Sequence, residues 1–271
     1  MPLPILHQTH QPTSADLIRY FHRAELHGSR HLGEETVLDV GTAIVNAELG
    51  RLMDANVILD ALLPEGMSPE QAVALVDEHY RAAGSRCRMW VMNPSSPPER
   101  NAPLVQYLMD QGHTRSSVDI HYLAGLPRTP ISEVGGLTII PARASYRHAR
   151  ALAEEAARNW SEPQLADAAL LHLDDPHTDA LIALKDGVPV AFVNVLSVGE
   201  IGEIAELFVS APFRGQGIGR TMMSRALEIC ARSLFKHVFL SVRPENDAAI
   251  ALYAGTGFVR IGEIVSYRVV E

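Results

Sequence analysis

Cysteine is scarce in this sequence, which has only Cys87 and Cys230 among its 271 residues. Each lies inside an expected secondary-structure element, so we expect two buried thiols in a reducing compartment rather than a disulfide. Long apolar runs are also missing, and none approaches the roughly 18 residues of a membrane-spanning helix. The N-terminus lacks a charged-then-apolar signal pattern. These absences argue against a disulfide-stabilised secreted domain and against a membrane protein, and we expect a cytoplasmic chain.

Positive charge is not concentrated anywhere in the chain. The formal net charge is −9, with no basic tail and no run of Lys or Arg, so we expect neither a nucleic acid nor a membrane as a partner. The 47% of hydrophobic and 20% of charged residues are typical of a globular protein. A length of 271 residues allows two domains of ordinary size.

Twelve histidines raise the question of a metal site. Those near the N-terminus have neither the spacing of a zinc site nor cysteine partners. They are His7, His10, His22, His27 and His31. We therefore expect surface histidines and no bound metal.

A glycine-rich loop lies between an apolar strand and a helix in the second half. The strand covers about residues 204–209 and the helical pattern about 218–233. The segment Val209–Thr221 reads V-S-A-P-F-R-G-Q-G-I-G-R-T, with glycines at alternate positions. Such a loop lets several backbone N–H groups approach one anion at the positive end of a helix dipole. Arg214 and Arg220 add charge that suits phosphate oxygens, so we predict a pyrophosphate site. The spacing fits neither a Rossmann turn nor a P-loop.

A second strand–helix segment follows at Val238–Phe258. Its apolar start, about residues 238–242, is typical of a strand. Asn246 is suited to cap the next helix, with Asp247 in the first turn. Asn246 and Tyr253 are close to two helical turns apart, so they share one helix face.

Together the two segments resemble the signature of the GNAT superfamily of N-acetyltransferases. Arg214, Gly217 and Gly219 match the fixed positions of its acetyl-CoA loop, R/Q-x-x-G-x-G/A. The second segment is similar to the pattern N-x-x-A-x-x-L-Y-x-x-x-G-F, and the matching positions are Asn246, Ala249, Leu252, Tyr253, Gly257 and Phe258. The resemblance implies an N-acetyltransferase that uses acetyl-CoA as cosubstrate and acetylates an amine of a small molecule or a protein.

The resemblance also implies how acetyl-CoA binds. Its diphosphate would accept hydrogen bonds from the backbone N–H groups of the loop. The preceding strand should carry a β-bulge and splay from residues 238–242, because only unpaired backbone groups can bond to the pantetheine amides. The expected cofactor-binding residues are Leu207, Phe208, Val209, Arg214, Gly215, Gln216, Gly217, Ile218, Gly219, Arg220, Asn246 and Tyr253.

Acetyl transfer needs an acid for the leaving thiolate and an acceptor for the amine proton. The resemblance implies Tyr253 as the acid, and a phenol with a pKa of about 10 can protonate the thiolate of a thiol with a pKa of about 8.5. Glu206 and Glu203 are candidates for the base, and water is the alternative. We prefer Glu206, since residues three apart on an unbroken strand face opposite sides and only one can face the substrate. His172 and His177 are weaker candidates.

The first half repeats the order of elements found after residue 200. A shift of 145 residues aligns Asn101 with Asn246, Leu108 with Tyr253 and Gly112 with Gly257, but the glycine loop and the tyrosine are missing. We predict an α/β (α+β) chain of two GNAT-like domains in tandem, similar in architecture to mycothiol synthase. Each would be a mixed, mostly antiparallel sheet flanked by helices. Residues 1–130 would form a degenerate domain without an acetyl-CoA loop and residues 137–271 the catalytic domain, with a linker at 126–136.

The sequence also predicts the positions of the other elements. Helices are expected at about 15–26, 69–83, 104–110, 145–160 and 162–172, with strands within 35–63 and at 88–92, 117–123, 137–141, 181–185 and 189–196. Two functional alternatives stay open: a module that binds acyl-CoA without turnover, and an acyltransferase for a longer acyl group. We expect a monomer or a homodimer.

Overall fold

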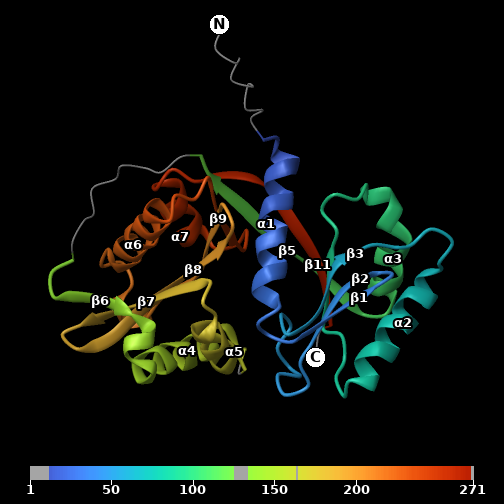
Figure 1. Ribbon diagram of the computed structural model, residues 1–271, viewed down its shortest axis with the longest axis horizontal. Helices are drawn as coiled ribbons and strands as arrows, with labels where there is room; N and C mark the ends of the chain where they lie inside the picture. Colours follow the sequence, from blue (N-terminus) through green and yellow to red (C-terminus); the bar gives the residue numbers. More distant parts are fainter. Residues whose placement is uncertain (1–11, 125–133, 163, 270–271) are drawn as a thin grey trace, which may run out of the picture.

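The computed structural model describes residues 12–124, 134–162 and 164–269, which form one mixed sheet flanked by helices (Figure 1). The strands are β1 Glu34–Leu38, β2 Gly41–Val45, β3 Asn56–Ala61, β4 Met89–Met92, β5 His113–Leu123, β6 Leu137–Pro141, β7 Thr178–Lys185, β8 Val188–Val198, β9 Ile201–Val209, β10 His237–Val242 and β11 Val259–Val269. The helices are α1 Ser14–Ser29, α2 Pro69–Ala82, α3 Pro98–Asp110, α4 Tyr146–Trp160, α5 Leu165–Asp174, α6 Ile218–Arg232 and α7 Asp247–Ala254. Two short 3-10 helices cover Ala142–Ala144 and Ala211–Phe213.

The sheet has eleven strands in the order β1-β2-β3-β4-β11-β5-β10-β9-β8-β7-β6. Only two neighbouring pairs, β3 with β4 and β9 with β10, run parallel within the described part of the chain. The prediction of an α/β chain with mixed, mostly antiparallel pairing is therefore confirmed. The two predicted sheets are joined into one.

Strands β5 and β11 connect the two halves of the sheet, because each of them is placed next to a strand of the other half. β5, from the first half, lies between β10 and β11, while β11, from the end of the chain, lies between β4 and β5. Strand β11 has no counterpart among the strands expected from the sequence. The division into residues 1–130 and 137–271 stays a prediction, and most of the predicted linker, residues 126–133, lies outside the described residues.

Local sequence explains some of the helix and turn boundaries. Ser68 and Gln71 form a reciprocal capping box at the start of α2, with Pro69 at its first position, as expected from the sequence. The turn between β7 and β8 has positive φ at both Asp186 and Gly187, which a tight hairpin requires. The expected start of α3 at residue 104 was wrong, because α3 begins at Pro98, where a first turn tolerates proline, and continues through Pro103 inside the helix.

Helix α1 occupies the middle of the molecule, with α4 to α7 on one side and α2 and α3 on the other (Figure 1). Its apolar face packs on strands of both halves, and the rings of Phe21 and Phe239 meet edge to face at a centroid distance of 6.1 Å. Here the expectation of surface histidines was wrong for His22, which is buried in α1. Burial of this helix face therefore stabilises both halves together.

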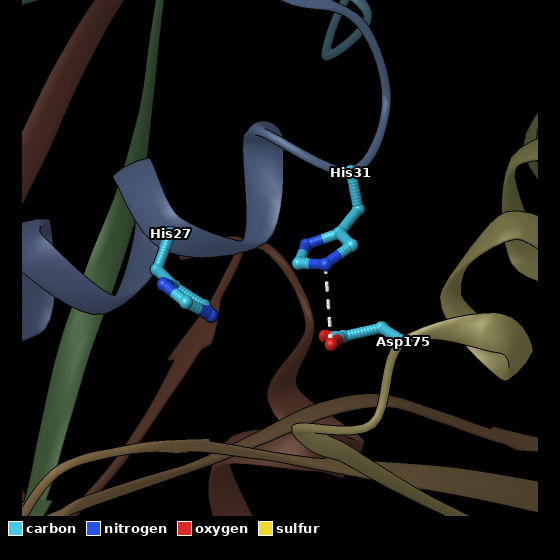
Figure 2. A group of neighbouring side chains, drawn as sticks. All are labelled: His27, His31 and Asp175. Carbon is cyan, nitrogen blue, oxygen red and sulfur yellow. Dashed lines mark ion pairs between the residues drawn. The ribbon is translucent and has the colours of Figure 1, made fainter.

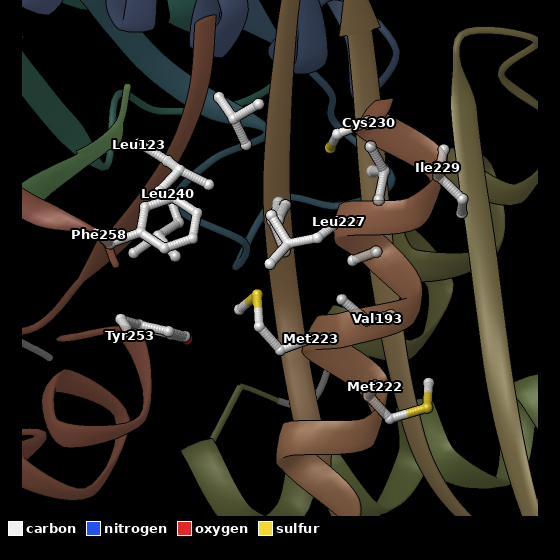
Figure 3. Packing of buried hydrophobic residues seen from close by; sticks show 14 of the residues in the cluster. Leu123, Val193, Met222, Met223, Leu227, Ile229, Cys230, Leu240, Tyr253 and Phe258 are labelled. Atoms are coloured by element: carbon white, nitrogen blue, oxygen red, sulfur yellow. The ribbon is translucent and has the colours of Figure 1, made fainter. Parts of the chain in front are cut away.

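A second core lies between the sheet and α6. Met222, Met223 and Cys230 project from α6 among the buried side chains of this cluster (Figure 3). Both Cys87 and Cys230 are buried and free, as predicted. No described helix has both the length and the apolar character needed to cross a membrane.

Candidate active site

The strand that leads into the glycine loop is bulged and splayed. The pairing of β9 with β8 shifts register between Phe192 and Asn194, opposite Glu206, which has a φ of +53°. The pairing of β9 with β10 extends only as far as Glu203 and Phe239. Residues 207–209 therefore have no strand partner on the β10 side, and the predicted bulge and splay are both confirmed.

The loop after β9 presents free backbone donors to the start of α6. Gly215 and Gly217 have φ values of +74° and +81°, a conformation that favours glycine. Gly217 is the N-cap of α6 and has no side chain to accept a hydrogen bond from the first turn. Within the described residues, the backbone N–H groups of residues 215–220 donate no hydrogen bond. An anion at this position would receive several donors and the positive end of the helix dipole.

A cavity of about 370 Å³ lies between this loop and α7. It includes nine of the residues expected at the cofactor site: Leu207, Phe208, Val209, Arg214, Gly215, Ile218, Gly219, Asn246 and Tyr253. Gln216, Gly217 and Arg220 do not line it. Gln216 instead accepts a hydrogen bond from Lys185, and Arg214 donates to Val209 O and Asn159 Oδ1.

Sequence reasoning missed other residues that line this cavity. Asn159 and Trp160, at the end of α4, and Phe213 in the loop also contribute. The ring of Trp160 stands edge to face on Phe208, with a centroid distance of 5.7 Å. The available signal for Trp160 was its place as an aromatic residue at the C-terminal end of an amphipathic helix.

Tyr253 lies at the buried end of the cavity. Its side chain packs beside Phe258, and Leu123 and Leu240 belong to the same cluster (Figure 3). The ring also meets His121 of β5 edge to face at a centroid distance of 6.4 Å. Burial raises the pKa of the phenol to about 12, so it stays protonated at neutral pH. Its hydroxyl is available as a proton donor rather than as a base.

A second, acidic space adjoins the first on the other side of the bulge. Cavities of about 180 Å³ and 320 Å³ are both lined by Glu25 of α1, Asp54 of the β2–β3 connection and Glu206. Trp160 lines both the larger of these and the cavity at the glycine loop. The acidic space therefore combines residues from both halves of the chain.

Glu203 and Glu206 both face this acidic space, so the expectation that only one of them could do so was wrong. Both line the smaller cavity together with Ala205. The left-handed backbone at Glu206 interrupts the alternation of the strand, and the side chain turns to the face that already carries Glu203. His172, a weaker candidate for the base, also lines this cavity.

Burial changes the acidity of these carboxyl groups. It raises the pKa of Glu25 to about 7, with a further increase from the nearby Asp54 carboxylate. Burial also raises the pKa of Asp54, Glu203 and Glu206. Glu206 accepts a hydrogen bond from Asn194, which favours its ionised form. A carboxylate with a raised pKa is a stronger base than one in water.

In the first half, side chains occupy the counterparts of the two backbone sites, namely the start of α2 and the end of β3. Ser68 and Gln71 bond to backbone N–H groups at the start of α2, which therefore offers fewer free donors than α6. Asn101 is buried and bonds to the backbone at the end of β3, accepting from Leu63 N at 3.0 Å and donating to Ala61 O at 3.3 Å. The backbone groups at this strand end are already paired.

Comparison with known proteins agrees with this geometry. Residues 146–258 match the model of the Acetyltransferase (GNAT) family. N-alpha-acetyltransferase RimI of Mycobacterium tuberculosis is 32% identical over 94 residues, covering 33% of this chain and 58% of that protein. N-alpha-acetyltransferase 30 of Saccharomyces cerevisiae is 33% identical over 78 residues, covering 29% and 43%. The matched region thus spans about half the length of these curated relatives.

The fold of nearly the whole chain also has a counterpart among solved structures. A GCN5-related N-acetyltransferase from Kribbella flavida superposes with a TM-score of 0.63 at 18% identity, covering 93% of this chain and 95% of the other. This likeness extends through the first half, where the glycine loop is missing. The second half of the chain, over residues 146–258, is an acetyltransferase domain of the GNAT family.

Proposed function

We propose that this chain is an acetyl-CoA-dependent N-acetyltransferase. The observation that carries the proposal is the cavity of about 370 Å³ bounded by the splayed end of β9, the glycine loop and Tyr253. The loop offers hydrogen-bond donors for a diphosphate, and the unpaired strand end offers backbone groups for amides. Acetyl-CoA carries both kinds of group, in that order, before its thioester.

The proposed cofactor pose follows from these surfaces. The diphosphate binds the N–H groups of residues 215–220, and the pantetheine amides bond to the backbone of Leu207 and to the N–H group of Val209, whose carbonyl already accepts from Arg214. Asn246, at the mouth of the cavity, reaches the pantetheine. The thioester then lies towards Tyr253 at the buried end. Trp160 lines both this cavity and the acidic space, so it lies where the two meet.

The acceptor amine enters from the acidic space. Its nitrogen attacks the acetyl carbon as the carbon–sulfur bond breaks. Glu206, directly or through a water molecule, takes the amine proton, and Tyr253 gives its hydroxyl proton to the thiolate. The pKa of Tyr253 of about 12 keeps that proton in place until the thiolate forms. The carboxylates around Glu206 favour an acceptor that arrives as an ammonium cation.

Thiol release from acetyl-CoA, measured with a panel of primary amines and peptides with free N-termini, tests the proposal. We expect amine-dependent release by the full chain, with a strong loss in Glu206→Gln. Glu200→Gln is the matched control, because Glu200 forms an exposed ion pair with Lys236 outside the cavities. Acetyl-CoA binding without turnover over the whole panel would favour a non-catalytic acyl-CoA module. Turnover only with longer acyl-CoA would favour the other alternative.

A further inference from the structure

A cluster of histidines and one aspartate joins the two halves of the chain near the acidic space (Figure 2). His27 lies in the last turn of α1 and His31 just after it, while Asp175 follows α5. One ligand atom from each of the three side chains lies within 4.8 Å of the other two. His31 Nε2 is 3.2 Å from Asp175 Oδ1.

The hydrogen bonds of this cluster leave two nitrogen atoms without partners. The Asp175 side chain is fully buried and accepts from His177 N and Thr178 Oγ1, each at 2.9 Å. His27 Nε2 and His31 Nδ1 are buried and have no hydrogen-bond partner within the described residues. A buried polar atom without a partner is uncommon in folded proteins and often marks an ion or a water molecule. Of the two atoms, His27 Nε2 is the one that an ion beside Asp175 could satisfy, because His31 faces Asp175 through Nε2 and its Nδ1 is on the other side of the ring.

A cluster held by hydrogen bonds alone would account for only part of this arrangement. It explains the contacts of Asp175 with His31 and with His177, whose Nδ1 is 3.3 Å from Asp175 Oδ1. It does not explain His27, whose ring lies 5.7 Å from that of His31 and 4.9 Å from that of His177 between centroids. Three imidazoles around one carboxylate make a donor set suited to a transition-metal ion.

We propose that His27, His31 and Asp175 bind a divalent first-row transition-metal ion, with Zn²⁺ as the best match. Ligand atoms at about 2.0–2.2 Å from a tetrahedral zinc ion stand about 3.3–3.5 Å apart. The pair formed by His31 and Asp175 already has this spacing, and the remaining pairs close by about 1.5 Å at most. The imidazole of His177, whose Nδ1 is 3.3 Å from Asp175 Oδ1, lies beside the three proposed ligands.

The site links segments that are far apart in the sequence. His27 and His31 belong to the first half, and Asp175 to the second. Gly28, between the two histidines, and Thr178, beside Asp175, line the cavity that contains Glu203 and Glu206. A bound ion therefore fixes one wall of the acidic space. The site stands on its own donors and does not depend on the proposed transferase activity.

Two features hide this site in the sequence. His27 and His31 have a helical spacing of four, but α1 ends at Ser29, between them. The third ligand lies 144 residues beyond His31 and is brought near only by the packing of α1 against the second half. We expected no bound metal because the sequence does not show that Asp175 lies beside His27 and His31.

Zinc binding to the full, untagged chain tests the proposal. Any bound metal is first removed from the protein with a chelator. Titration with Zn²⁺ against a chromophoric chelator should show one more tight site in the wild type than in His27→Gln/His31→Gln. His79→Gln/His148→Gln is the matched control, since neither residue belongs to the cluster, and it should bind as the wild type does. Loss of one ligand should lower the affinity of this site for Zn²⁺ by about 10-fold or more.

A second measurement covers the case in which the double variant folds poorly. His27 Nε2 makes no hydrogen bond within the described residues, so His27→Gln alone should fold like the wild type. Zn²⁺ should raise the melting temperature of the wild type and the control, but not that of His27→Gln. Equal zinc stoichiometry in the wild type and both cluster variants, or an equal rise in melting temperature, would overturn the proposal.

Discussion

Replacing Glu25 by Gln should make the protein more stable at alkaline pH. Burial, with a contribution from Asp54, raises the pKa of Glu25 from 4.5 to about 7. A group with a raised pKa contributes stability that is fully present below pH 4.5 and lost as the pH rises through 7. At about 1.4 kcal/mol per pKa unit, the complete loss is about 3 kcal/mol. Gln resembles the protonated carboxyl group and carries no charge at any pH.

Urea unfolding at about pH 5 and pH 8 measures this effect. Relative to the wild type, the free energy of unfolding of Glu25→Gln should increase by roughly 2 to 3 kcal/mol between the two pH values. The exposed Glu65 provides the matched control, and Glu65→Gln should follow the wild type at both. If Glu25→Gln keeps a constant difference from the wild type across this range, Glu25 is not held in its neutral form by the acidic space.

Three further predictions concern the cofactor site. Tyr253→Phe should lower kcat at least about tenfold with little change in acetyl-CoA affinity, because only the proton donor is removed; an unchanged kcat would remove Tyr253 from the mechanism. Gly217→Ala should weaken acetyl-CoA binding in calorimetry. Gly187→Ala is the control, because Gly187 has the same φ of +81° and the substitution should cause a similar backbone strain of about 1–2 kcal/mol without weakening acetyl-CoA binding. Calorimetry should also return one acetyl-CoA per chain, since Asn101 and the capping box of α2 fill the corresponding places in the first half; two sites would contradict this account.

The sequence predicted the features that depend on short-range chemistry. The glycines at 215 and 217 need positive φ, and the helix starts at Ser68 and Asn246 follow from capping side chains. The bulge and the splay of β9 came from the family resemblance, because no residue type in β9 requires them. Glu206 adopts a positive φ that its sequence gives no reason to expect.

The rest of the site depends on contacts between distant segments. Glu25 and Asp54 carry no motif. Glu25 faces Glu206 because α1 packs on both halves, and Asp54 lines the same cavity from the β2–β3 connection. The exchange of β5 and β11 leaves no trace in local periodicity, since each strand would have the same pattern with either neighbour. His121 is an example, because its position beside Tyr253 follows from the insertion of β5 next to β10.

The strand exchange determines whether the first half can be removed from the chain. Within the described residues, β11 pairs only with β4 and β5, so the C-terminal strand is anchored entirely by residues that precede the acetyltransferase domain. A truncated chain lacking residues 1–124 would expose one edge of β10 and release β11, and such open edges promote aggregation. The segment without a cofactor loop is thus a folding partner built into the same polypeptide, and an isolated acetyltransferase domain is the wrong starting point for assays.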